Sequence, residues 1–369
     1  MSYLSHASVK IVEPIDGAIL NRNNGKQHQN GLEITARVKA PGKSKVTING
    51  TTVLAASGYD NEFLSDIVLR GQENVITVQS ESNGTINTDA ITVLWDKNSF
   101  KRYRFSTDDN ILFLKNLAVN APRYRSIFDN EYLAFWKEMH EKYGTKLHFN
   151  IYYQTEGFNL SQMPEKYKSE WQESSDWIRL TFHALQDEPD KPYIKASYAE
   201  MDRDYKLITR EIERFAGKEL LSPFTTVHWG ETTSEGCRAL RDNGIKGLVG
   251  VFTFDENRKP SIAYYLDEER TRYLSGHDYW KDTKMGMFFI KHDLVINNVE
   301  IRNIPQTLDS IASNPNRSEV MEVIIHEQYF EPSFSHYEPD ARERVIATIE
   351  WLLKNGYKSV FYEEGFLGS

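Results

Sequence analysis

The chain has 369 residues, a formal net charge of −9 and a pI near 5.7, with 40% hydrophobic and 26% charged residues. This length favours two domains over one, and the composition is that of a soluble globular protein with a substantial core. No basic stripe is present, so nucleic acid and anionic membrane surfaces are excluded as favoured partners. The pattern gives no indication of the oligomeric state.

The single cysteine, Cys237, excludes an internal disulfide and a thiolate metal cluster, and we expect it to pack in a core. No run of about 18 apolar residues is present, so we predict no membrane span. The start of the chain, MSYLSHASVK, lacks the apolar core of a signal peptide, so we expect a cytoplasmic protein. A chain from which a leader had been removed would look the same, and would be secreted or periplasmic.

Residues 1–98 predict an all-β domain. Short segments alternate apolar with polar residues, and pairs such as Pro-Gly and Asn-Gly separate them. Six or seven strands at roughly 8–12-residue spacing indicate a β-sandwich. The pieces GQENVITVQS and DAITVLW resemble bacterial immunoglobulin-like modules. The resemblance implies an immunoglobulin-like sandwich that is held together by its apolar core alone.

Residues 99–369 show a different sequence pattern, which predicts alternating strands, loops and helices. Helices are predicted in EYLAFWKEMHEKYG, SEGCRALRDNG and DARERVIATIEWLLKNG, and each ends at a glycine before a predicted strand. Such junctions imply parallel strands joined by crossover helices. About 270 residues with at least six strands favour a (β/α) barrel over an open sheet.

Several apolar runs in this second domain end in histidine or a carboxylate. In parallel α/β folds the carboxyl ends of the strands share one face, where active sites are built. Each of these residues alone could be structural, since aspartate commonly ends a strand and a buried histidine can be hydrogen-bonded in a core. Together they predict one cleft, formed by the strand ends at Asp108 and Asp109, His183, His228, His292 and Asp293, and His326 and Glu327.

Histidines and carboxylates without cysteine are the ligands of an open site for zinc or a related divalent ion. The ion would lower the pKa of a bound water and polarise a carbonyl. A carboxylate that is not a ligand could then take the proton of the water, and a histidine across the cleft could protonate the leaving group. Because adjacent residues of a strand point to opposite sides, Asp108 and Asp109 can serve one site only if the chain turns there.

The order of these motifs from residue 100 to the C-terminus resembles the polysaccharide deacetylase (NodB-homology) family of carbohydrate esterases. The first motif of that family is a strand ending in Thr-Phe-Asp-Asp. Here FSTDD implies that Asp108 is the general base and Asp109 a metal ligand. The resemblance also implies a (β/α) barrel of the polysaccharide deacetylase type, a divalent metal cofactor and a carbohydrate substrate.

The second motif of the family supplies two metal histidines four residues apart. Here FHALQD keeps the first as His183 and has Asp187 at the place of the second. The third ligand is therefore expected to be Asp187, with His228 as the alternative.

The last motif of the family ends in a histidine after an apolar run, and EVIIHEQYF implies that His326 is the general acid. The segment TTVHWGETTSEGCRALRDNGI lies at the place of the third motif but lacks the arginine of the family. We assign substrate binding to the remaining side chains near these strand ends, which are His228, Trp229, His292, Asp293 and Glu327.

The leading hypothesis is a metal-dependent hydrolase that removes an acyl group, expected to be acetyl, from an amide on a sugar. A second hypothesis is a carbohydrate-binding protein on a non-catalytic barrel, because the second-motif histidine and the third-motif arginine are replaced. A third is a metal-independent glycoside hydrolase that pairs Glu327 with Asp108 or Asp293 across a sugar.

Overall fold

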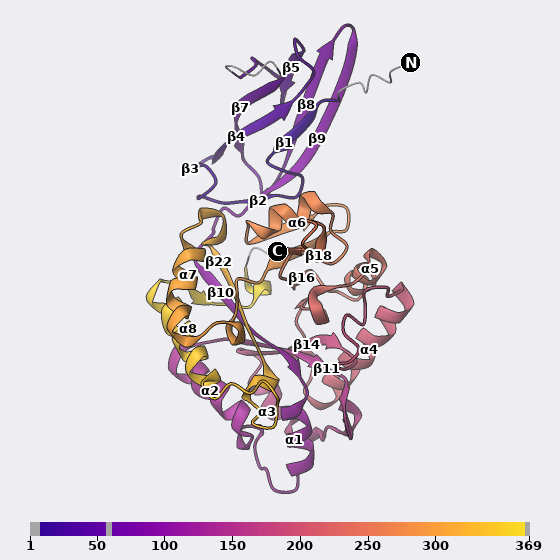
Figure 1. Cartoon of the computed structure of the whole chain (residues 1–369), viewed down its shortest axis with the longest axis vertical. Coiled ribbons are helices and arrows are strands. Elements are labelled where there is room, and N and C mark those ends of the chain that lie inside the picture. The colour runs from indigo at the N-terminus through magenta and orange to yellow at the C-terminus, as the bar shows by residue number, and fades with distance from the viewer. Residues whose placement is uncertain (1–7, 57–60, 366–369) are drawn as a thin grey trace. The chain divides into compact units, whose positions relative to one another are not determined.

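The computed structural model describes residues 8–56 and 61–365, which divide into two compact units (Figure 1). The first unit contains the chain up to Ser99 together with the distant segment Tyr279–Met285, and the second contains the rest. The sequence division after residue 98 did not anticipate that distant segment. Its Trp280 is buried and donates a hydrogen bond from Nε1 to the carbonyl oxygen of Asp16 at 2.6 Å.

The first unit is built from two sheets. One has the order β1-β4-β3, with β7 also paired to β4, and the other has the order β2-β9-β8-β5-β6. Their long strands alternate buried with exposed side chains, which is the pattern of a sheet with one face in a core. The strands of this unit are β1 (Lys10–Glu13), β2 (Ile19–Leu20), β3 (Lys26–His28), β4 (Gly31–Lys39), β5 (Lys45–Ile48), β6 (Thr51–Val53), β7 (Glu62–Leu69), β8 (Glu73–Ser82), β9 (Thr85–Trp95) and β19 (Tyr279–Asp282).

The second unit contains two parallel sheets. The larger has the order β14-β11-β10-β22-β21, with β23 also paired to β10, and the smaller contains β15-β16-β20. Two short hairpins are separate from them. The strands are β10 (Arg102–Asn110), β11 (Leu147–Tyr152), β12 (Gln154–Thr155), β13 (Phe158–Asn159), β14 (Ile178–Ala184), β15 (Phe224–Thr225), β16 (Gly247–Gly250), β17 (Thr253–Phe254), β18 (Pro260–Ile262), β20 (Met287–Lys291), β21 (Leu294–Val295), β22 (Val320–His326) and β23 (Lys358–Ser359).

The predicted closed barrel is wrong in one respect, because the ring of strands is open. Between β14 and β15 the described residues form only a single bridge, from Leu180 to Leu221. Strand β15 has two residues before the chain turns away, which is too short for a ladder. At β20, in the smaller sheet, the chain passes to the larger sheet through Asp293. The carboxylate of Asp293 accepts a hydrogen bond from the backbone nitrogen of Glu322, in β22 of the larger sheet, at 3.0 Å.

Helices connect the parallel strands, and in Figure 1 α7 and α8 lie on one flank of β10 and β22 while α4 and α5 lie on the other. The three predicted helices are present, and α2 ends at Gly144, where φ is 69°. Cys237 is buried on α5, as expected. No helix among the described residues is long and apolar enough to cross a membrane. The α-helices are α1 (Leu112–Asn120), α2 (Glu131–Tyr143), α3 (Lys168–Glu173), α4 (Tyr198–Phe215), α5 (Ser234–Asp242), α6 (Glu268–Ser275), α7 (Ile304–Ala312) and α8 (Ala341–Lys354).

Candidate metal and catalytic site

Strand β10 ends in a turn that brings two adjacent carboxylates into one cavity. Its ladder to β11 loses register between Thr107 and Asn110, and Asp109 has a φ of 62°, in the left-handed region. Aspartate tolerates this region better than most residues, because its short side chain can form local hydrogen bonds. Asp108 and Asp109 are both buried and both line the cavity, so the chain makes the turn that a shared site requires.

Three acceptor atoms from three segments converge beside this turn. Nε2 of His183, in β14, lies 3.1 Å from Oδ1 of Asp109. Nδ1 of His228, in the short helix η5 (His228–Gly230), lies 3.2 Å from Nε2 of His183 and 3.4 Å from Oδ1 of Asp109. Ligand atoms about 2.0–2.2 Å from one first-row ion would be separated by roughly these distances. Among the described residues, this triad is the one group of three such side chains spaced to hold a metal ion.

The outer nitrogens of both imidazoles are held by backbone carbonyls. Nδ1 of His183 lies 2.6 Å from the carbonyl oxygen of Thr226, and Nε2 of His228 lies 3.1 Å from that of Asp187. A carbonyl oxygen only accepts hydrogen bonds, so each of these nitrogens carries a proton. In the neutral imidazoles, the lone pairs of the other two nitrogens then face each other and Asp109. Such an arrangement can hold a cation, either a proton or a metal ion, between them.

The acid–base properties of the triad agree with this role. Burial would raise the pKa of Asp109, but hydrogen bonds from His183 and His228 outweigh it and hold that pKa well below its usual value. Burial would lower the pKa of His183, but the charge of Asp108 and the hydrogen bond to Asp109 raise the net pKa above its usual value. The site therefore attracts positive charge, and a metal ion would compete with a proton for it.

Three neighbouring side chains that the sequence analysis did not identify orient the two carboxylates. The hydroxyl of Tyr152, at the end of β11, donates to Oδ1 of Asp109 and lies 3.0 Å from Nδ1 of His228. Nε2 of Gln328 donates to Oδ2 of Asp109 at 2.6 Å. Nδ2 of Asn150 donates to Oδ1 of Asp108.

The cavity around the triad has a volume of about 420 Å³, and His326 lies on its wall. Asp108 and His326 are direct partners in the ladder between β10 and β22. Nδ1 of His326 lies 2.9 Å from Oδ1 of Asn297, which accepts a hydrogen bond from it. That bond leaves Nε2 of His326 as the ring nitrogen that can serve the cavity.

The structure favours His228 over Asp187 as the third member of the triad. The side chain of Asp187 is 72% exposed, and its Oδ1 lies 3.9 Å from Nε2 of His228, on the side of the ring that the backbone carbonyl of Asp187 already occupies. Trp229 and His292, both expected to bind substrate, line the cavity. Burial lowers the pKa of His292 well below its usual value, which keeps the ring neutral.

Asp293 and Glu327, also expected to bind substrate, have structural partners instead. Oδ1 of Asp293 lies 2.6 Å from Nη2 of Arg317, and neither residue lines the cavity. The carboxylate of Glu327 accepts hydrogen bonds from the backbone nitrogens that begin α1, at 2.6–2.8 Å. Helix α1 has no side-chain cap of its own, so Glu327, directly after the distant strand β22, supplies it. Neither carboxylate lines the triad cavity.

No protein-family model matches this chain, and no curated protein matches it. Among solved structures, a protein described as a polysaccharide deacetylase from Mycobacterium smegmatis is 9% identical over 73% of this chain and 90% of that chain, with a TM-score of 0.41. One from Bordetella bronchiseptica, described as a polysaccharide deacetylase involved in O-antigen biosynthesis, is 9% identical over 70% and 92% of the two chains, with a TM-score of 0.36.

The 4-alpha-glucanotransferase of Thermococcus litoralis is 14% identical over 72% of this chain and 40% of its own length, with a TM-score of 0.45. The chain thus spans less than half of that enzyme. With TM-scores below 0.5, these three resemblances establish neither a fold family nor an activity.

Proposed function

We propose that this protein is a metal-dependent hydrolase that removes an acyl group, namely N-acetyl, from an amino sugar of a saccharide, as polysaccharide deacetylases do. The observation that carries the proposal is the convergence of acceptor atoms from Asp109, His183 and His228 within 3.4 Å of one another. This convergence lies in a cavity that Asp108 and His326 also line.

The triad side chains would hold the ion, and zinc is the ion we propose, because two histidines and one aspartate are among its common ligands. When bound, the ion supplies Lewis-acid chemistry, which lowers the pKa of a water and polarises a carbonyl. The side chain of Tyr152 and that of Gln328 hold the Asp109 carboxylate in place for this purpose. Such supporting hydrogen bonds fix the orientation of ligands before an ion binds.

Asp108 would act as the general base. The hydrogen bond from Asn150 to Oδ1 fixes the orientation of its carboxylate. The other oxygen, Oδ2, lies 4.0 Å from Nε2 of His183 and therefore on the triad side. A carboxylate held there can accept the proton of a water that attacks the amide carbonyl, which contributes roughly 10²–10⁴-fold to the rate.

His326 would act as the general acid. Its Nδ1 proton is engaged by Asn297, so a proton transferred to the substrate must leave from Nε2. The departing nitrogen of the amide is a poor leaving group as an anion, and a proton from His326 lets it leave as an amine. Asp108 and His326 come from adjacent strands and can serve the two ends of the same bond change.

The carboxylates predicted to act as a pair in a glycoside hydrolase have other partners in the structure. That chemistry needs two carboxyl groups about 5–10 Å apart across the sugar. Glu327 is engaged at the start of α1, and Asp293 is paired with Arg317. For the first unit we infer an immunoglobulin-like sandwich, and its two sheets of alternating strands support this inference.

Amine release from tri-N-acetylchitotriose tests the proposed reaction. The purified protein should release amine, lose this activity on treatment with a chelator and regain it when zinc is added. A carbohydrate-binding protein without catalytic activity would bind the trisaccharide and release nothing. Amine release that is unaffected by the chelator would contradict the metal-dependent mechanism.

A further inference from the structure

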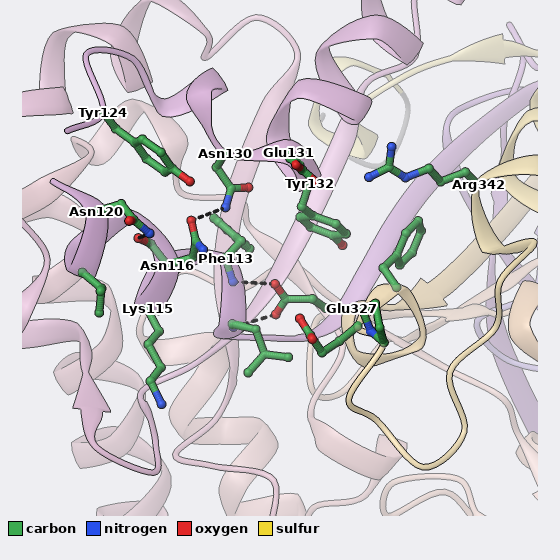
Figure 2. A pocket seen from close by; sticks show the side chains of 15 residues that line it. Phe113, Lys115, Asn116, Asn120, Tyr124, Asn130, Glu131, Tyr132, Glu327 and Arg342 are labelled. Atoms are coloured by element: carbon green, nitrogen blue, oxygen red, sulfur yellow. Dashed lines mark hydrogen bonds between the residues drawn. The ribbon is translucent and has the colours of Figure 1, made fainter.

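A second cavity, of about 530 Å³, adjoins the short helix η9 (Glu327–Phe330) in the second unit (Figure 2). Gln328 and Tyr329 of η9 line the triad cavity, whereas Glu327 and Phe330 line the second cavity. This helix is thus the shared wall of two cavities beside the carboxyl ends of β10 and β22. The volume of the second cavity is in the range of small-molecule sites.

The charges around this cavity do not select an anion. Helix α1 forms one wall, but Glu327 already accepts hydrogen bonds from its first backbone nitrogens and offsets the positive end of the helix. Side chains of both signs lie around the cavity, with Arg342 opposed by Glu131 and Glu331. Lys115 also lines the cavity, and its Nζ donates a hydrogen bond at 2.7 Å to the carbonyl oxygen of Glu156, a residue that does not line it. An uncharged polar ligand therefore fits best.

Polar groups lie on one side of the cavity, where Figure 2 shows Asn116, Asn120, Tyr124 and Asn130 close together. Nδ2 of the buried Asn130 donates to Oδ1 of Asn116 at 3.0 Å, which orients the amide of Asn116. Within the described ranges, Nδ2 of Asn116 and the hydroxyl of Tyr124 form no hydrogen bond with another residue. These two groups are available to a ligand.

Aromatic rings form another part of the wall. Tyr132 stacks on Phe113, with ring centroids 5.7 Å apart, and meets Phe330 edge-on at 5.2 Å. The three rings support one another and give the cavity a rigid apolar surface. Phe330 belongs to η9, so this surface is continuous with the wall of the triad cavity.

We propose that this second cavity binds an uncharged saccharide ring and is a secondary site for the saccharide on which the triad cavity acts. A pyranose presents hydroxyl groups at its edge, which match the amide of Asn116 and the phenol of Tyr124. Its C–H faces match the rings of Tyr132 and Phe330. A saccharide bound here is held near the triad cavity without filling it. The role as a substrate site rests on the proposed function, whereas binding itself does not.

Calorimetric titration of the full chain carrying His183→Ala tests the site without turnover of the ligand. The probes are tri-N-acetylchitotriose, cellotriose and mannotriose. Tyr124→Ala, added to this background, should weaken the binding of the best trisaccharide by roughly tenfold or more, the scale of a lost stacking or hydrogen-bonding side chain. Asn116→Asp should do the same, because it keeps the oxygen that Asn130 needs and removes only the amide donor.

Asn116→Asp also keeps the proposal testable if Tyr124→Ala fails to fold. The site is refuted if none of the three trisaccharides binds, or if Asn116→Asp binds them as well as its parent does. Failure of the proposed reaction looks different: trisaccharide binding would stay sensitive to Asn116→Asp, while the wild-type protein with metal released no amine.

Discussion

Two buried carboxylates lie at the carboxyl ends of neighbouring parallel strands, and different groups surround them. Asp109, at the end of β10, lies beside one nitrogen of each of two imidazole rings. The other nitrogen of each ring carries a proton, which it donates to a backbone carbonyl. Glu327, directly after β22, meets three backbone N–H donors. Hydrogen bonds outweigh burial and hold the pKa of Asp109 well below its usual value, whereas burial outweighs hydrogen bonds and raises that of Glu327 to about 7.

The difference shows that neither burial nor position at a strand end identifies a functional carboxylate. Glu327 has both properties, and its donors account for every role that the structure gives it. Asp109 has both properties as well and accepts hydrogen bonds from Tyr152 and Gln328, but it also lies beside two imidazole nitrogens that can act as metal ligands. The kind of partner therefore separates the candidate metal site, where two imidazole nitrogens lie beside Asp109, from the helix cap, where backbone N–H groups donate to Glu327.

The largest expected effect concerns Asp108, the carboxylate next to the triad. Asp108→Asn should reduce turnover by roughly 10²–10⁴-fold, the scale of a lost general base, and should keep the metal content. The amide is close in shape to the carboxylate but cannot accept the proton. Amine-release kinetics and metal analysis on the same preparation measure both effects.

Glu327→Gln is the matched control for Asp108→Asn, because it makes the same chemical change at the helix cap. Its turnover per folded molecule should stay near that of the wild type. Equal losses of turnover in the two variants would erase the distinction between the two carboxylates.

A smaller effect is expected for the phenol that supports the triad. Tyr152→Phe removes the hydroxyl that donates to Asp109 and should weaken the binding of the metal ion by roughly 10–100-fold. Tyr124→Phe, which removes a hydroxyl in the second cavity, is the control and should leave the dissociation constant of the ion unchanged. Competition with a chelator of known affinity measures both constants, and no change in Tyr152→Phe would exclude it as a supporting group.

The smallest effect concerns the pH dependence of stability. The pKa of Glu327 is raised from 4.5 to about 7 by burial. Between these values the folded state binds more protons than the unfolded state, so the contribution of Glu327 to the free energy of unfolding falls as the pH rises. Glu327→Gln removes this contribution and should lower the free energy of unfolding by about 1–2 kcal/mol near pH 4.5, because its NH2 group cannot accept a hydrogen bond from a backbone nitrogen, whereas both oxygens of the carboxyl group can.

The difference between Glu327→Gln and the wild type should shrink as the pH rises toward about 7. Urea unfolding across this range measures it, and Glu331→Gln, an exposed carboxylate near η9, should stay within roughly 0.5 kcal/mol of the wild type. A difference that grows with pH would show that Glu327 is ionised throughout and would overturn the sign of this prediction.

The sequence located the strands that build the site but not the direction of every side chain at their ends. Apolar runs ending in polar residues led to Asp108, Asp109, His183 and His326, because parallel strands deliver their ends to one face. The same rule led to Glu327, whose side chain faces α1. Beyond the end of a strand the regular alternation is lost, so the pattern no longer tells which way a residue points.

Motif spacing does not fix the direction of the Asp187 side chain, for a related reason. A residue four positions after His183 returns to the same side only in a helix. Here β14 ends at Ala184, and residues 185–188 are not helical, so the side chain of Asp187 lies largely exposed at the edge of the cavity, with Oδ1 3.2 Å from the hydroxyl of Tyr152. Tyr152 was hidden in a buried strand, where an aromatic residue predicts core packing. The open ring of strands depends on the two-residue length of β15, which periodicity does not resolve.

The central claim is that Asp109, His183 and His228 hold one divalent ion, and metal content tests it most directly. The wild type and the variants His183→Ala, His228→Ala and Asp187→Ala are dialysed against zinc and then against metal-free buffer, and zinc per chain is measured by mass spectrometry. We expect close to one ion in the wild type and in Asp187→Ala, and loss of the ion in both histidine variants. Loss of the ion in Asp187→Ala with retention in His228→Ala, or a wild type that holds no ion, would contradict the claim.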